Sequence, residues 1–438
     1  MSFLDAPRVV TSRFEHADSH TLSRFIATGG YDGLRKAVTM TPEAVAAEVD
    51  RSGIIGRGGA GFPTGRKWSM LRPAPVRYLV INGDESEPAT FKDHALVTRD
   101  PHQLVEGALI AAYAVQATQV FLYVRGEFAL GLERVQAALN DAYRQGAVGR
   151  DIFGSGFSVD AIVHPGAGAY ICGDETALLE SLEGKRGFPR VKPPYYPAVT
   201  GLYGEPTIVN NVETVSSLPW IINNGGAAFA AMGAPTSTGT RVFALAGDVM
   251  RPGNYEIELS KPSFRDLVFA PELGGGLRPG RTLKAIVPGG TSAFWIGPDR
   301  LDLALDQKAV ADAGTMLGSG SVVVMDDTQC MVRAAWRISR FYHRESCGQC
   351  TPCREGSGWV ENILRRIEAG SGREDDLDLL LDVCDNISPE VTWPSKWPPQ
   401  QTTICPLGPS IPAAVVSSIG MFRDEYMVHI KDGGCPFD

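Results

Sequence analysis

The chain has 438 residues, of which 44% are hydrophobic and 21% charged; this is typical of a globular protein with room for about three domains of ~150 residues each. The formal net charge of -9 argues against nucleic acid as the main partner, since phosphate backbones bind basic surfaces. The start of the chain lacks the apolar core of a signal peptide, and no stretch approaches the ~18 apolar residues that span a bilayer. We therefore expect a cytoplasmic protein that is soluble or held to a membrane only through partners.

The first part of the chain alternates predicted helices and strands. A mostly polar lead-in over residues 1–40 contains a short helix over 21–27. Further helices are predicted over 41–53, 102–116, 129–143 and 174–183, and strands over 76–83, 119–124 and 158–164. This alternation predicts an α/β domain with a largely parallel sheet, over residues 1–240.

The pattern changes near residue 240. Strands over 242–246, 255–259 and 283–287, with a short helix over 263–268, predict a small α+β module over residues 241–326. Helices over 328–342, 359–369, 374–387 and 411–426 then predict a helical bundle over residues 327–438. The proline-rich stretch between the third and fourth of these helices must be a loop.

Three of the eight cysteines form a C-x2-C-x2-C motif, which is the sharpest signal in the sequence: Cys347, Cys350 and Cys353. A tight loop can direct three thiolates to three corners of one iron–sulfur cube. Cys405, followed by Pro406 in a loop, is the preferred fourth ligand, and Cys384 inside a predicted helix is its competitor. A zinc site is the alternative, although structural zinc usually takes two C-x2-C pairs. The remaining cysteines are expected to be buried or surface thiols: Cys172, Cys330 and Cys435.

A glycine-rich loop runs from residue 56 to 65 and matches G-x-G-x-x-G: Gly56, Arg57, Gly58, Gly59, Ala60, Gly61, Phe62 and Gly65. An ordinary dinucleotide fingerprint follows a strand, but a helix is predicted here, so an ordinary Rossmann turn is not expected. Bare backbone amides, with Arg66, Lys67 and an exposed aromatic ring nearby, suit a bound phosphate beside a ring system. A flexible structural loop is the alternative.

A second glycine loop leads from a predicted strand into the helix that begins at Asp174 and Glu175. Carboxylates in a first helical turn favour the helix dipole but repel a phosphate. We expect them to contact flavin or ribose hydroxyls and to favour NADH over NADPH. Ordinary helix-terminal charges are the alternative.

Two more loops carry polar groups. Asn82-Gly83-Asp84-Glu85-Ser86-Glu87 follows a predicted strand, and ligands of open α/β sheets bind at such ends. Thr207 to Thr214 includes Val209, Asn210 and Asn211, whose paired amides could bind the edge of a heterocycle. A solvated acidic turn and a helix cap are the respective alternatives.

These four loops and the cysteine triplet, in this order, resemble the NADH-oxidising flavoprotein subunit of respiratory complex I over essentially the whole chain. The resemblance implies a Rossmann-like FMN-binding domain, a β-grasp module for soluble ligands, and a helical bundle that holds one [4Fe–4S] cluster. It further implies hydride transfer from NADH to FMN, which makes no acid–base residue obligatory, followed by single-electron transfer to the cluster.

The resemblance places two groups of residues at the cofactors. The flavin positions are Gly56, Arg57, Gly58, Lys67, Asn82, Asp84, Ser86, Tyr170, Gly173, Glu175, Asn210, Asn211 and Thr214. The NADH positions are Phe62, Glu87, Asp174, Lys192 and Tyr195, with Glu87 and Asp174 near the nicotinamide. Because one extra residue follows Pro194 here, either Tyr195 or Tyr196 could stack on adenine.

The implied partners are a thioredoxin-like [2Fe–2S] subunit and a large multi-cluster iron–sulfur subunit, on the inner face of the cell membrane. A diaphorase subunit of a soluble NAD-linked hydrogenase or formate dehydrogenase is the second reading. A zinc- and nucleotide-binding interaction module is a third, and the visible spectrum would separate it from the other two.

Overall fold

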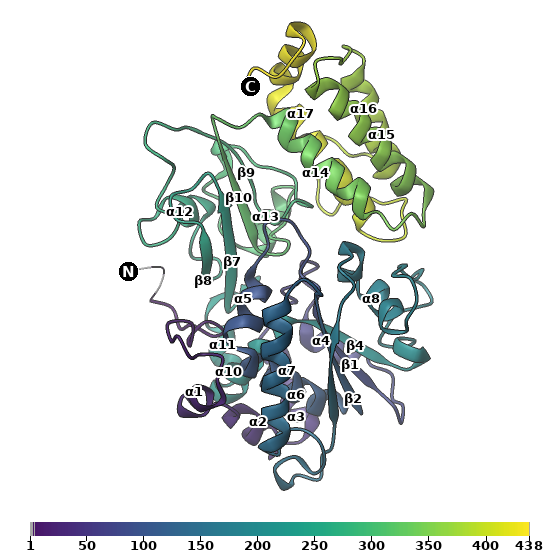
Figure 1. The fold of residues 1–438 in the computed structure, drawn as a ribbon. Helices are drawn as coiled ribbons and strands as arrows, with labels where there is room; N and C mark the ends of the chain where they lie inside the picture. Colours follow the sequence, from purple (N-terminus) through teal and green to yellow (C-terminus); the bar gives the residue numbers. More distant parts are fainter. Residues whose placement is uncertain (1–2, 4, 438) are drawn as a thin grey trace. The chain divides into compact units, whose positions relative to one another are not determined.

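A computed structural model describes residue 3 and residues 5–437 (Figure 1). These divide into two compact units. The first comprises the residues up to 86, 90–243 and 254–261, and the second comprises 87–89, 244–253 and the residues from 262 on. Among the described residues, no helix has both the length and the apolar character needed to cross a membrane.

The first unit is built on a four-stranded parallel sheet of order β3-β2-β1-β4. Its strands are β1 (Tyr78–Gly83), β2 (Gln119–Val124), β3 (Asp160–Pro165) and β4 (Thr207–Asn211). The first three confirm the predicted strands. The fourth was predicted as a loop or helix cap, because its asparagines hid the apolar start of the strand.

Four helices precede the first strand: α1 (Leu22–Ala27), α2 (Asp32–Ala37), α3 (Pro42–Arg51) and α4 (Thr64–Ser69). The strands are connected by α5 (Lys92–Arg99), α6 (Pro101–Val115), α7 (Ala129–Arg144) and α8 (Glu175–Leu182), and are followed by α9 (Val212–Ser216), α10 (Leu218–Asn224) and α11 (Gly226–Ala230). The predicted helix over 41–53 is confirmed as α3, with Thr41 accepting a hydrogen bond from the Ala44 N–H as its N-cap. The first glycine loop therefore follows a helix, as expected, and leads into α4, which was not predicted.

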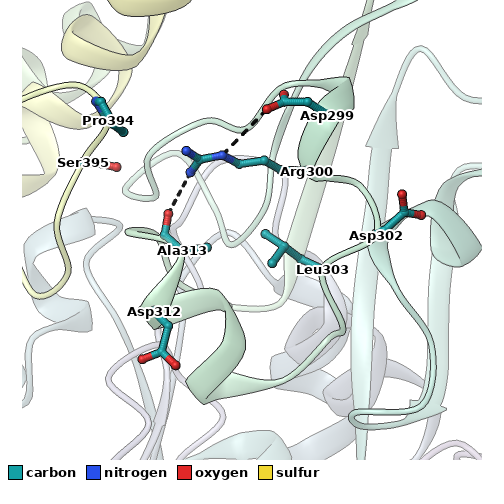
Figure 2. Close-up of a pocket in the computed structure, with 8 residues that line it drawn as sticks. All are labelled: Asp299, Arg300, Asp302, Leu303, Asp312, Ala313, Pro394 and Ser395. Atoms are coloured by element: carbon teal, nitrogen blue, oxygen red, sulfur yellow. Dashed lines mark hydrogen bonds and ion pairs between the residues drawn. The ribbon is translucent and has the colours of Figure 1, made fainter.

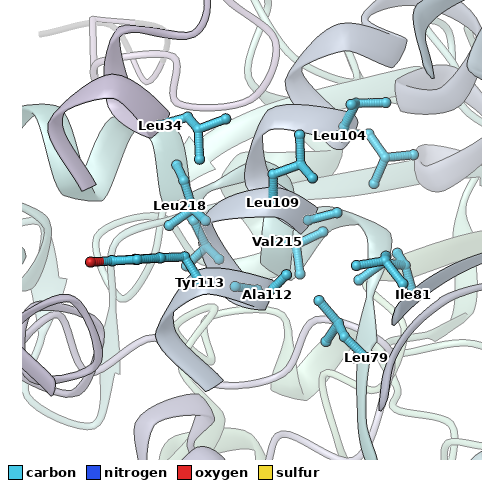
Figure 3. Close-up of a cluster of buried hydrophobic side chains, with 14 of the residues drawn as sticks. Leu34, Leu79, Ile81, Leu104, Leu109, Ala112, Tyr113, Val215 and Leu218 are labelled. Carbon is cyan, nitrogen blue, oxygen red and sulfur yellow. The ribbon is translucent and has the colours of Figure 1, made fainter. Parts of the chain in front are cut away.

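The core of the first unit lies between β1 and α6. Side chains alternate along a strand, so Leu79 and Ile81 share one face of β1, and Figure 3 shows them beside Leu109 and Ala112 of α6. These four side chains are at most 2% exposed. Nearly all of α6 is buried, and the helix contacts both β1 and β2.

A second sheet has the order β8-β7-β10-β9 and is formed by β7 (Thr240–Gly247), β8 (Gly253–Glu258), β9 (Leu283–Val287) and β10 (Ser321–Asp326). The short strands β5 (Gly233–Ala234) and β6 (Ser237–Thr238) pair with each other. Strands β9 and β10 belong to the second unit, whereas β5, β6, the first half of β7 and nearly all of β8 belong to the first. Strand β10, which was not predicted, is parallel to β7 and antiparallel to β9. Helix α12 (Phe264–Phe269) lies between β8 and β9 in the chain, and α13 (Gln307–Asp312) lies between β9 and β10.

Four helices complete the chain: α14 (Met331–Glu345), α15 (Thr351–Glu368), α16 (Asp376–Ile387) and α17 (Leu407–Asp432). Helix α14 packs on α15 and α17, and α16 packs on the same two helices (Figure 1). This bundle agrees with the predicted one, except that α15 begins eight residues before the predicted position 359.

Candidate functional site

The carboxyl ends of β1 and β4 bring two of the predicted loops together. In the register of this parallel pair, Asn82 lies opposite Asn211. The strand order 3-2-1-4 reverses direction between β1 and β4, and ligands of open α/β sheets bind at such a switch point. The loops that follow these two strands therefore lie where the topology favours a ligand.

The first glycine loop lies against β4. The backbone N–H of Arg57 donates to Thr214 Oγ1 at 2.9 Å. At Gly58, a Cβ atom would lie 3.2 Å from the Asn211 Cβ, tighter than most real contacts, so this close approach favours glycine. The first and fourth predicted loops thus form one surface.

The cations of the glycine loop do not all face solvent. The Arg57 side chain is buried, and its Nη2 donates to the carbonyls of Thr238 and Thr240 at 3.0 Å. Arg66 and Phe62 are exposed, as expected for the loop. Arg57 therefore contributes its backbone to the loop surface, while its guanidinium anchors the loop to the start of β7.

Two lysines neutralise Glu175 at the start of α8. Lys67 Nζ lies 2.9 Å from Glu175 Oε2, and Lys192 Nζ lies 2.9 Å from Oε1. Burial alone would raise the pKa of Glu175, but the two ammonium groups outweigh it and hold the pKa at about 2. Glu175 is thus a permanent carboxylate at neutral pH.

Asp174 acts as the N-cap of α8. Its Oδ1 accepts from the N–H groups of Thr176 and Ala177 at 2.9 and 3.1 Å. This is the helix-terminal role that the sequence left open for it. No lysine pairs with Asp174 in the described ion pairs, in contrast to Glu175.

The loop after β1 is ordered by its own polar groups. Asn82 Nδ2 donates to the Gly173 carbonyl at 2.9 Å, which joins this loop to the second glycine loop. Asp84 is 1% exposed, and Ser86 Oγ donates to its Oδ2 at 3.1 Å. Glu85 accepts from the N–H groups of Asp93 and His94 at the start of α5. The acidic turn is therefore built into the fold and is not solvated throughout.

Glu87 belongs to the second unit. Its Oε1 accepts from Thr291 Oγ1 at 3.0 Å and from the Ser292 N–H at 2.9 Å. The other predicted flavin and NADH residues all lie in the first unit. Tyr170 begins a short 3-10 helix (Tyr170–Gly173), and Tyr195 and Tyr196 are nearly equally exposed at 46% and 47%.

Two groups of residues that contact the fourth loop were not predicted from the sequence. Trp68 Nε1 donates to Asn210 Oδ1 at 2.9 Å and orients that amide. Lys92 Nζ lies 2.8 Å from both Asp93 Oδ1 and Glu213 Oε2, with all three side chains buried. Burial alone would lower the pKa of Lys92, but Asp93 and Glu213 outweigh it and raise the pKa.

This buried ion network reaches the site directly, since Asn211 Nδ2 donates to Asp93 Oδ2 at 2.6 Å. Glu213 is only two residues beyond Asn211, but Lys92 and Asp93 are more than a hundred residues away in sequence. The one available signal was Glu213 within the fourth loop, because an acid in an apolar helical turn needs a buried cation.

The cysteine triplet lies at the junction of α14 and α15. Cys347 is in the connecting loop, Cys350 is the N-cap of α15, and Cys353 lies in the first turn of the helix. The expectation of one tight loop is therefore wrong for Cys353, which the helix holds. Burial raises the pKa of Cys353 to about 11, and the thiols of Cys350 and Cys347 act in the same direction.

The two candidates for a fourth ligand have different environments. Cys405 is buried in the loop directly before α17, as predicted. Cys384 is fully buried inside α16, and burial raises the pKa of its thiol. Burial raises the pKa of Cys353 as well, so the feature that separates the two candidates is placement: Cys405 lies in a loop, and Cys384 lies within a helix.

The spacing of these thiols bears on the zinc alternative. Four thiolates on one zinc ion, each at ~2.3 Å, bring the sulfur atoms within about 3.8 Å of one another. Among the described residues, one group of three or more possible metal-ligand atoms has all its members within 4.8 Å of one another. That group contains none of Cys347, Cys350, Cys353 and Cys405. These four thiols are therefore not grouped as closely as the ligands of one zinc ion.

A cavity of about 450 Å³ lies elsewhere in the second unit (Figure 2). Arg300 crosses it and donates to the Ala313 carbonyl at 2.9 Å. None of the predicted site residues lines this cavity. Its lining residues are Asp299, Arg300, Asp302, Leu303, Asp312, Ala313, Pro394 and Ser395.

Comparison with known families gives two matches. Residues 49–220 match the model of the Nuo51 FMN-binding domain, and residues 333–429 match the NADH-ubiquinone oxidoreductase-F iron-sulfur binding region. The first spans the glycine loops and the sheet edge, and the second spans the cysteine triplet and Cys405.

Three relatives cover nearly the whole chain. The F subunit of the NADH-quinone oxidoreductase of Mycobacterium tuberculosis is 47% identical over 98% of this chain and 95% of its own length. The F 2 subunit of the Rhizobium meliloti NADH-quinone oxidoreductase is 46% identical over 96% and 97%. The NADP-reducing hydrogenase subunit HndC of Solidesulfovibrio fructosivorans is 42% identical over 98% and 84%.

Among solved structures, a chain of an NAD+-reducing [NiFe]-hydrogenase in the H2-reduced state aligns with a TM-score of 0.78 at 34% identity. The alignment covers 99% of the present chain but 66% of the hydrogenase chain.

Proposed function

The chain belongs to the family of NADH-quinone oxidoreductase F subunits, and from this premise we propose that NADH delivers a hydride to FMN at the carboxyl edge of the β3-β2-β1-β4 sheet. The chain is an oxidoreductase that binds FMN and a [4Fe–4S] cluster. When bound, FMN accepts the hydride, and the cluster carries the electrons onward one at a time. The observation that carries the proposal is the convergence of four polar loops on the β1/β4 switch point.

The residues at this edge fit FMN by their chemistry. The glycine loop offers backbone N–H groups, which suit a phosphate, and it lies against the amide of Asn211. Asn82, Asp84 and Glu175 offer amide and carboxylate oxygens for ribityl hydroxyls. We assign FMN to the following residues: Gly56, Arg57, Gly58, Lys67, Asn82, Asp84, Ser86, Tyr170, Gly173, Glu175, Asn210, Asn211 and Thr214. The remaining proposed cofactor-binding positions in the same loops are Gly59, Ala60, Gly61, Gly65, Glu85 and Val209.

A soluble-ligand-binding β-grasp module is proposed over 241–326, most of which lies in the second unit, and a cluster-binding bundle is proposed over 327–438. The sheet of β7, β9 and β10 supports the first assignment, and the packing of α14–α17 supports the second. Cys347, Cys350, Cys353 and Cys405 are the proposed ligands, because the first three share one helix junction and the fourth lies in a loop.

NADH is proposed to stack over the flavin and contact the residues around α8. Phe62 and Tyr195 are exposed aromatic side chains suited to stacking, and Lys192 lies beside Glu175. Asp174 and Glu87 are the acids proposed near the nicotinamide. We propose NADH as the preferred donor because the Asp174 carboxylate would repel a 2′-phosphate placed beside the start of α8.

The proposed partners are a thioredoxin-like [2Fe–2S] subunit and a large multi-cluster iron–sulfur subunit, in a complex on the inner face of the cell membrane. A diaphorase role in a hydrogenase is the second candidate, favoured by the likeness to the hydrogenase subunit HndC and to the NAD+-reducing hydrogenase chain. Formate dehydrogenase remains part of that alternative. Purification of the complex through a tag on this chain separates the two: NADH-dependent quinone reduction supports the first role, and hydrogen-dependent reduction of NAD(P) supports the second.

The cofactor assignments are tested on the full chain, purified anaerobically with its cofactors. We expect FMN absorption that bleaches on addition of NADH and an EPR signal from a reduced [4Fe–4S] cluster. A colourless protein that binds zinc in place of iron would support the interaction-module reading instead and overturn the proposal.

A further inference from the structure

Four side chains at one end of the helical bundle form a second group of metal-ligating atoms, and we propose that they bind a structural zinc ion. They are Cys330 at the N-cap of α14, Glu368 at the end of α15, His429 near the end of α17, and Cys435 just beyond it. Their ligand atoms all lie within 4.8 Å of one another. From the sequence, both cysteines had been expected to be plain thiols.

The separations of three of the four ligand atoms match those expected in a tetrahedral zinc site. Cys330 Sγ lies 3.3 Å from His429 Nε2 and 3.6 Å from Glu368 Oε2, and His429 Nε2 lies 3.4 Å from Glu368 Oε2. Zinc bonds of ~2.3 Å to sulfur and ~2.0–2.2 Å to nitrogen and oxygen place tetrahedral ligands about 3.4 to 3.8 Å apart. Three atoms from three helices thus already have the spacing that one zinc ion would impose.

Neighbouring groups orient these ligands. His429 Nδ1 lies 2.7 Å from the Glu425 carbonyl, so a proton on Nδ1 donates there and leaves Nε2 with its lone pair toward the group. This second hydrogen bond is typical of metal-bound histidines. The N–H of Arg333 donates to Cys330 Sγ at 3.2 Å, and its Nε donates to Glu368 Oε1 at 2.5 Å. Each of the three ligands is therefore fixed by a partner outside the group.

The ligand set and its burial select the metal. Two thiolates and an imidazole suit zinc, whereas magnesium and calcium prefer oxygen. His429 is fully buried and Cys330 is 5% exposed, so this is not an exposed acidic cluster. Two thiolates and the Glu368 carboxylate carry three negative charges; one zinc ion and the Arg333 guanidinium supply three positive charges. Bound zinc would make the buried group neutral.

The proposed zinc site lies far from the proposed iron–sulfur site. Cys353 lies in the first turn of α15 and Glu368 is its last residue, 15 positions later. At ~1.5 Å per residue this separates the two ends by about 22 Å. The zinc is therefore expected to clamp α14, α15 and α17 and not to share ligands with the cluster.

Metal analysis of the full chain with its cluster and FMN tests the proposal. We expect one zinc per chain in addition to the iron, and a zinc K-edge EXAFS spectrum with two sulfur ligands at ~2.3 Å and two nitrogen or oxygen ligands at ~2.0–2.2 Å. Iron and flavin do not contribute to this edge. A wild-type protein without zinc after exposure to zinc, or a spectrum with four sulfur ligands, overturns the proposal, since four sulfurs would place zinc at the other cysteines.

Variants provide a second readout. Cys435→Ser changes the more exposed of the two cysteines and is expected to lower zinc content at least tenfold while iron content and the cluster EPR signal stay unchanged. His429→Gln is expected to do the same. Cys172→Ser, a buried thiol of the first unit, is the matched control and should keep its zinc. Zinc retained in both site variants, or a Cys330–Cys435 disulfide in the anaerobic protein, would contradict the site.

Discussion

Lys67 Nζ lies 2.9 Å from Glu175 Oε2 and 2.8 Å from the Val209 carbonyl, so one ammonium group joins α4, α8 and β4. The three residues are separated by at least 34 positions of sequence, and each segment carries part of the proposed FMN site. This cation therefore holds together three segments of the proposed site.

Removing the cation is expected to destabilise the protein. In a double-mutant cycle of Lys67→Met and Glu175→Gln, we expect a coupling of about 1 to 2 kcal/mol in the free energy of unfolding, because Lys67→Met leaves a half-buried carboxylate short of one partner. Urea unfolding of the four proteins measures it. Lys192→Met is the control. Lys192 also pairs with Glu175 but contacts no carbonyl of β4 in the described hydrogen bonds, so Lys192→Met alone should lower the free energy of unfolding less than Lys67→Met alone.

Asp174 is expected to set the preference for NADH. Asp174→Asn keeps the side-chain oxygen that caps α8 but removes the charge, so a 2′-phosphate would meet less repulsion. We expect kcat/KM for NADPH to rise roughly tenfold, about 1.4 kcal/mol, with little change for NADH. Steady-state kinetics with an artificial electron acceptor measure both values. An unchanged ratio would show that Asp174 does not discriminate between the dinucleotides.

Tyr195 and Tyr196 allow a matched comparison, since their exposure is nearly the same. Stacking of a base on an aromatic ring contributes about 1 to 3 kcal/mol, so Tyr195→Ala should raise KM for NADH roughly tenfold. Tyr196→Ala should change it little. The reverse order of effects would move the adenine contact to Tyr196.

Cys405 and Cys384 separate the fourth cluster ligand from its competitor. Cys405→Ser is expected to abolish or strongly alter the EPR signal of the NADH-reduced cluster, because serine is a poor replacement for a soft thiolate. Cys384→Ser, deep in α16, should retain the signal even if the protein loses stability. Loss of the signal only in Cys384→Ser would reverse the assignment.

His102 is expected to make the first unit sensitive to acid. Burial lowers the pKa of His102 to about 4, below its ordinary value of 6.5, although Asp141 opposes the shift. The unfolded chain therefore binds more protons between these values, and stability that is complete above pH 6.5 is lost as the pH falls toward 4.

The loss should amount to about 1.4 kcal/mol per pH unit below 6.5. In the native protein the rings of Phe25 and His102 stack with their centroids 5.3 Å apart. His102→Phe removes the titrating ring but keeps an aromatic side chain beside Phe25. Urea unfolding at about pH 7.5 and pH 5.5 should show a weaker pH dependence in the variant. Equal losses in both proteins would exclude His102 as the cause.

Local patterns predicted much of the fold. The bounds of β2 match the prediction because its apolar run lies between two clear helices. Helix α15 was predicted to start too late because Gly356 and Gly358 lower helix propensity. A Cβ at Gly356 would lie 2.7 Å from Ile387 Cδ1, so the close packing of α15 on α16 favours glycine at this position despite its low helix propensity.

The candidate site was predicted in part. Loops whose chemistry is local, such as the glycine loop and the cysteine triplet, were found from their residues. The partners of these loops were not: Trp68 contacts Asn210, and Lys92 contacts Glu213, only because the sheet brings them together. Long-range pairs of this kind leave no pattern in a single sequence.

The shared edge of the parallel sheet has a consequence for local opening of the backbone and for amide hydrogen exchange. Segments near residues 58, 84, 174 and 211 all belong to the proposed FMN site, so occupancy by FMN would stabilise all of them at once. Amide hydrogens in these four separate stretches should then exchange with solvent at rates that fall together when FMN binds, while the far ends of the same strands exchange as before.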